Sequence, residues 1–86
     1  MALIIQGLFL DFGHVDQDQE YVDAFGRHLK SLRLKAGLTQ EKLAEYCNVD
    51  FTQIGRYERG VRSPSLASLR KLANALKVHP KDLLDF

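Results

Sequence analysis

Only three residues, 48–50, separate two short segments that each carry the apolar spacing of a helix. Residues 40–47 and residues 51–59 both place apolar side chains at intervals of three and four. Thr39 and Asp50 are suited to cap the two helices, and the asparagine that opens the turn tolerates a left-handed backbone. The sequence therefore predicts two short helices that cross at a tight turn.

Helical spacing also marks the segments before and after this pair. A helix is predicted from residue 20 or 21 to about residue 36, where Gly37 ends it. Ser65 can cap a further helix with a wide apolar stripe, and Pro80 opens a short terminal one. The prediction is an all-α fold of five short helices.

The amino-terminal segment differs from the rest of the chain. Residues 1–19 are predicted to form an apolar and acidic arm, and residues 20–86 the helical domain. Leu, Ile and Phe are dense in the arm, but Gly7 and Gly13 interrupt them, which favours two short extended pieces. The arm is too short, and has too few flanking basic residues, to anchor the chain in a membrane.

Charge is unevenly distributed along the chain. Residues 1–26 contain five acidic residues and no Lys or Arg, whereas residues 27–81 contain all twelve basic residues against four acidic ones. A stretch this basic favours a polyanionic partner. With 86 residues, one cysteine and no signal segment, the chain is predicted to be a single cytoplasmic domain.

The wider sequence around the two central helices resembles a known family. Ala44 supplies the small residue needed where such helices cross, and the neighbouring strings read LRLKAGLTQEKLA, YERG and PSLASLRKLANAL. Together they resemble the helix-turn-helix of phage repressor and Cro proteins, also called the XRE family, over residues 22–86. The resemblance implies a five-helix, lambda-repressor-like domain that binds double-stranded DNA. Asn48 stands where the family most often has glycine, and asparagine can adopt the same backbone.

The resemblance places the second helix of the pair, about residues 50–58, in the DNA major groove. The implied base-contacting residues are Phe51, Thr52, Gln53 and Arg56. Arg56 suits guanine, whereas Thr52 and Gln53 suit either a base or a phosphate. Phe51 stands where relatives often present a hydrogen-bonding side chain, and it can contact a thymine methyl group. The alternative is an ordinary solvated helix face.

Four residues are implied to hold the DNA backbone, namely Gln40, Lys42, Arg59 and Arg62. Gln40 opens its helix, where an amide and free backbone N–H groups can bind a phosphate. Arg59 and Arg62 are expected in the loop after the second helix, on the flanks of the groove. For Lys42 the alternative role is to keep the surface soluble.

Other polar residues are expected to be structural. Arg33 and Glu58 occupy positions that form an ion pair between two helices in the family. Cys47 is expected in the core, because no His or Lys stands beside it in the sequence. The three histidines lack the spacing of metal ligands, and no nucleophile or phosphate-binding motif occurs. We therefore expect no metal, no cofactor and no enzymatic activity.

The resemblance implies a bacterial or phage-type transcriptional regulator, a repressor or controller, that binds a near-palindromic operator as a homodimer. The expected dimer surface is apolar and comprises Val78, Leu83, Leu84 and Phe86. The arm, over residues 3–12, is a further candidate for that surface. The alternative function is a protein-interaction module, such as an antitoxin-type partner of another protein, which the acidic residues 11–23 favour.

Overall fold

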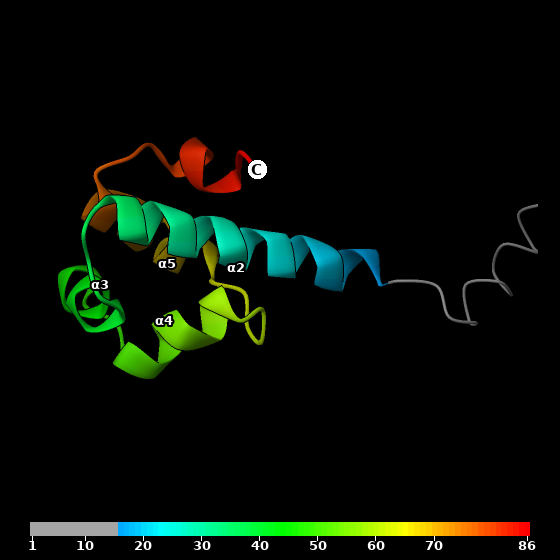
Figure 1. The fold of residues 1–86 in the computed structure, drawn as a ribbon, viewed down its shortest axis with the longest axis horizontal. Coiled ribbons are helices and arrows are strands. Elements are labelled where there is room, and N and C mark those ends of the chain that lie inside the picture. Colours follow the sequence, from blue (N-terminus) through cyan, green and yellow to red (C-terminus); the bar gives the residue numbers. More distant parts are fainter. Residues whose placement is uncertain (1–15) are drawn as a thin grey trace, which may run out of the picture.

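Five consecutive helical segments make up most of residues 16–86, the part of the chain that the computed structural model describes (Figure 1). They are α2 (Gln17–Lys35), α3 (Gln40–Cys47), α4 (Phe51–Glu58), α5 (Leu66–Leu76) and the 3-10 helix η1 (Pro80–Leu84). No strand occurs within the described residues. The all-helical architecture is therefore confirmed, although only four of these segments are α-helices and not the five that the sequence predicts.

The terminal segment η1 is the one that differs in type. The backbone N–H of Asp82 donates to the carbonyl of His79 at 2.8 Å, which is the i to i+3 bond of a 3-10 helix. The His79 ring accepts from the Lys81 N–H, and the Asp82 carboxylate accepts from the His79 N–H. Only five residues are available, too few for an extended α-helical ladder, because forming the first turn of a helix is costly.

Side-chain caps set the starts of the other helices. Thr39, Asp50 and Ser65 each accept a backbone N–H from the first turn of α3, α4 and α5, as the sequence predicts. Asn48 adopts the predicted left-handed conformation, with φ of 57°. The tight turn between α3 and α4 is therefore confirmed.

The start of α2 lies earlier than predicted, at Gln17 rather than at residue 20 or 21. The Asp16 carboxylate accepts the backbone N–H groups of Asp18 and Gln19, at 3.0 and 3.3 Å. This cap precedes the first apolar residue of the helical stripe. The apolar pattern alone therefore places the helix start too late.

The core lies where the helices meet, with α3 packed on α4 and α5, and η1 packed on α2 and α5. In Figure 1, α2 runs between η1 on one side and α4 on the other. The fully buried large side chains come from all five segments and are Leu29, Leu43, Ile54, Leu72 and Leu83. The prediction that Leu83 lies on a dimer surface is wrong, because α2 and α5 enclose its side chain.

Helices α2 and α4 approach one another closely at Gly26. A Cβ atom at this position would lie 2.5 Å from the carbonyl oxygen of Glu58 and 2.6 Å from that of Tyr57. Both neighbours are backbone atoms, so they cannot rotate out of the way. Gly26 therefore sets the distance between the two helices.

The apolar arm falls largely outside the described residues, and the boundary predicted at residue 20 stays a prediction. None of the helices within residues 16–86 is long and apolar enough to cross a membrane.

Candidate nucleic-acid interface

A shallow concavity of about 230 Å³ lies on the outer side of α4. Its lining residues are Gln40, Phe51, Thr52, Gly55, Arg56 and Arg59. All except Gln40 belong to α4 or its cap, at the one-, three- and four-residue intervals that define one helix face. The structure therefore brings together five of the eight residues implied to contact DNA. It adds Gly55, which the sequence analysis missed although position 55 shares this face.

Three residues of the α4 face are open to solvent. Thr52 and Arg56 are exposed, and the Phe51 side chain is 47% exposed although it is aromatic. The Thr52 hydroxyl donates to Asp50 Oδ1 at 3.1 Å. This face combines a cation, a hydroxyl and an apolar ring on one short helix.

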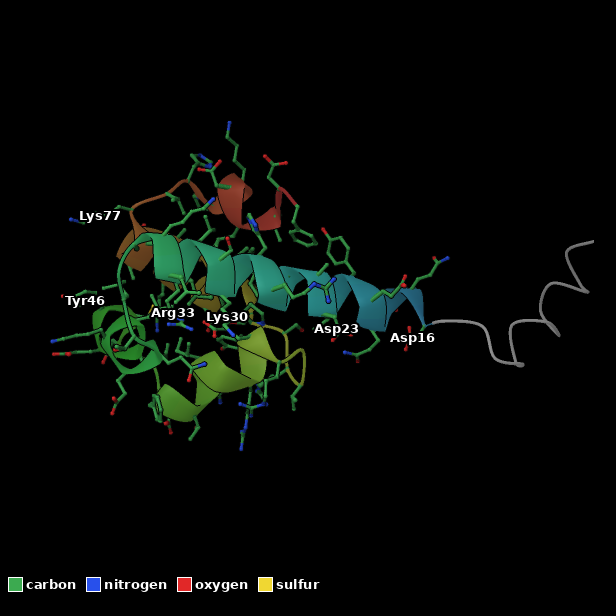
Figure 2. The ribbon with its side chains drawn as sticks, viewed as in Figure 1. Asp16, Asp23, Lys30, Arg33, Tyr46 and Lys77 are labelled. Atoms are coloured by element: carbon green, nitrogen blue, oxygen red, sulfur yellow. The ribbon has the colours of Figure 1, made fainter. Side chains whose placement is uncertain are left out.

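A buried ion pair holds Gln40 at the edge of the concavity. Arg33 Nε donates to Glu58 Oε2 at 2.6 Å, and Arg33 Nη2 donates to Glu58 Oε1 at 3.1 Å. Gln40 Nε2 donates to the same Glu58 Oε1 at 2.9 Å. Figure 2 shows Arg33 on the side of α2 that faces α3 and α4. The contact between α2 and α4 thus also fixes the first residue of α3.

Gln53 lies away from the concavity. Each helical residue advances by about 100°, which puts position 53 about 130° from the centre of the α4 face. The side chain is half-buried, and Gln53 Oε1 is enclosed with no hydrogen-bond partner among the described residues. Its predicted base contact is therefore not part of this surface.

Lys42 and Arg62 also lie outside the residues that line the concavity. Lys42 Nζ donates to Glu45 Oε1 at 3.2 Å and lies 5.9 Å from the centre of the Tyr46 ring. The hydrogen bond and the negative charge of Glu45 raise the pKa of Lys42 above its usual value. Arg62 is exposed in the loop after α4, as predicted.

Acidic side chains at the start of α2 lie beside the loop that follows α4. Figure 2 shows Asp16 and Asp23 along the amino-terminal half of α2, away from α3. Gln19 Nε2 donates to Asp23 Oδ1 and to the carbonyl of Gly60, both at 2.9 Å, which ties this acidic end to the loop after α4. Asp23 therefore lies next to Gly60, which stands between Arg59 and the rest of the basic loop.

Cys47 is a structural residue of the core. Cys47 is buried, and its thiol donates to the carbonyl of Lys71 at 3.7 Å. Burial raises the pKa of the Cys47 thiol to about 11, against a smaller opposing effect of the Lys71 charge. The nucleophilic thiolate is therefore scarce near neutral pH. Within residues 16–86, no cluster of three or more His, Cys, Asp or Glu side chains could hold a metal ion.

Comparison with known proteins places this architecture in a family. Residues 29–83 match the family described as "Helix-turn-helix". Control protein C.BamHI of Bacillus amyloliquefaciens is 48% identical over 63 residues, which covers 72% of this chain and 78% of that protein. HTH-type transcriptional regulator ImmR of Bacillus subtilis is 39% identical over 61 residues, and the match spans 48% of that longer protein.

A solved structure agrees with these matches. The crystal structure of the restriction-modification controller protein C.AhdI from Aeromonas hydrophila superposes with a TM-score of 0.70 and 42% sequence identity. The match covers 74% of this chain and 96% of that one. The chain belongs to the phage repressor and Cro-type, or XRE-type, helix-turn-helix family of DNA-binding transcriptional regulators.

Proposed function

We propose that this regulator binds a near-palindromic DNA operator as a homodimer, with α4 in the major groove of each half-site. We further propose that it does so in the bacterial cytoplasm. The observation that carries the proposal is the concavity on α4, where two arginines and the Gln40 amide gather on one open face. The diameter of an α-helix with its side chains, about 10–12 Å, is comparable to the width of the major groove, about 12 Å.

The base-reading roles follow from position on the α4 face. Phe51 and Thr52 lie in its first turn and Arg56 in its second, the turns that reach base edges in such complexes. We assign Arg56 to guanine O6 and N7, because a guanidinium can donate two parallel hydrogen bonds. Phe51 suits a thymine methyl group, since its exposed ring has no hydrogen-bonding atom.

The phosphate-binding roles fall to the residues around this face. Gln40 begins α3, where the helix dipole favours an anion, and Arg59 and Arg62 follow α4. Lys42 is the weakest of the four candidates, because Glu45 already neutralises its charge.

An apolar surface at the carboxyl terminus supports the homodimer. The Phe86 ring lies 5.1 Å from that of Tyr21 and 5.6 Å from that of His28, measured between ring centres. Tyr21, Leu84 and Phe86 all remain largely exposed, and a second copy of the chain would cover them. Val78, the remaining predicted member of this surface, is half-buried and packs against the core.

The relatives with the higher identities favour a controller. C.BamHI is 48% identical and C.AhdI 42% identical to this chain, against 39% for ImmR. We therefore propose that the chain acts as a small controller of transcription, as the names of C.AhdI and C.BamHI indicate for those proteins.

Selection from a randomised duplex pool tests this function. We expect the purified protein to enrich an inverted repeat whose half-sites are about one helical turn apart. If each half-site contacts about four phosphates, the logarithm of the binding constant should fall with the logarithm of salt concentration with a slope near −7. Binding is measured by fluorescence anisotropy at several salt concentrations.

Two results would count against the proposal. Enrichment of a single half-site, with a slope near half the expected value, would contradict the homodimer. Weak binding without sequence preference would favour the protein-interaction module instead.

A further inference from the structure

Arg59 does not extend away from α4 with the loop that follows it. Its guanidinium folds back along the helix and covers Gly55, which lies one turn earlier. A Cβ atom at Gly55 would lie 2.9 Å from Arg59 Nη1 and 3.8 Å from Arg59 Cζ. The Arg59 side chain therefore occupies the space that a side chain at position 55 would need.

The glycine at position 55 is not explained by the backbone. The glycines with positive φ in the described part of the chain are Gly37 and Gly60, and Gly55 is not among them. Glycine in the interior of a helix lowers its stability relative to alanine. The short helix α4 thus contains a residue that weakens it without a conformational need.

The nearest neighbours of the buried Gly55 are side chains that line the concavity. The three atoms nearest to a Cβ at this position belong to Arg59 and Gln40, the Gln40 atom being Oε1 at 3.8 Å. At Gly26, by contrast, the nearest atoms are backbone carbonyls of α4. Gly55 therefore makes room for two side chains that line the concavity.

We infer that Gly55 is a positioning residue for DNA binding. Its missing side chain lets the Arg59 guanidinium lie in the concavity beside Gln40, where Arg59 binds a phosphate of the DNA backbone. Any side chain at position 55 pushes Arg59 out of this place. The inference rests on the proposed DNA-binding function, and it assigns to Gly55 an effect that acts through Arg59.

The test is Gly55→Ala, which should change stability and DNA affinity in opposite directions. We expect the midpoint of thermal unfolding to rise by about 4 °C or more, because alanine strengthens α4 and the exposed Arg59 side chain can rotate away. Affinity for the selected duplex should fall about tenfold, and the salt slope should become shallower by about two, because the homodimer loses one phosphate contact in each half-site. If Gly55 had only a structural role, the thermal midpoint and the DNA affinity would not change in opposite directions.

A double-mutant cycle shows whether Gly55 acts through Arg59. Arg59→Ala alone should weaken binding about tenfold, and adding Gly55→Ala to it should change affinity by less than twofold. The inference is overturned if Gly55→Ala binds as tightly as the unmodified chain. It is also overturned if Gly55→Ala weakens binding equally with and without Arg59. If the unmodified chain binds no duplex, the proposed function itself fails, which is a different result.

Discussion

Replacing Glu58 with alanine is expected to lower the free energy of unfolding by about 3–5 kcal/mol. The Arg33 and Glu58 side chains are only 8% and 3% exposed, so the substitution leaves the Arg33 guanidinium buried without its carboxylate partner. Gln40 loses its acceptor at the same time. Since small domains are stable by about 5–15 kcal/mol in total, this loss is a large share of the stability of the domain. Urea denaturation followed by circular dichroism measures the change.

A matched double variant shows how much of this loss of stability comes from burying an unpaired charge. Replacing both members of the pair, Arg33→Leu with Glu58→Leu, removes the two charges together and should cost less than Glu58→Ala alone. If Glu58→Ala lowers the free energy of unfolding by less than about 1 kcal/mol, the ion pair does not hold α2 and α4 together.

Gly26→Ala is expected to destabilise the chain by as much as about 2 kcal/mol. The added Cβ would lie 2.5 and 2.6 Å from two backbone carbonyl oxygens, so α2 and α4 must move apart. Such overpacking typically costs about 1–3 kcal/mol and here must also exceed the gain of about 1 kcal/mol in helix propensity. The measurement is again urea denaturation.

Gly55→Ala is the matched control, since it makes the same chemical change in another helix of the same domain. Its nearest neighbours are the ends of side chains, so the stability should rise instead of falling. Equal effects of the same sign at the two glycines would contradict this account of the contact between α2 and α4.

Local signals explain why much of the fold is predictable from the sequence. The caps at Thr39, Asp50 and Ser65 and the left-handed Asn48 each depend on the residue itself and its next few neighbours. The bounds of α3 and α4 follow from these signals directly.

Other features depend on distances between helices, which the apolar pattern does not contain. Leu83 has the same sequence signature whether it faces the core or a partner, and only the packing of η1 on α2 and α5 decides. Gly26 and Gly55 each lie inside a predicted helix, and the sequence does not distinguish them. In the structure, Gly26 lies against backbone atoms, whereas the nearest neighbours of Gly55 are side chains. The pairing of Arg33 with Glu58 spans 25 positions and was available only from the family resemblance.

The most direct test of the central claim is the binding of Arg56→Ala to the selected duplex and to duplexes with single base-pair changes. We expect a loss of about 1–3 kcal/mol in binding free energy for each half-site of the selected duplex, with relaxed preference at one position of each half-site. Lys77→Ala removes one positive charge at the carboxyl end of α5, away from α4 (Figure 2), and should keep both affinity and sequence preference. A loss that is equal for every duplex, or equal for the two variants, would contradict base reading by the α4 face.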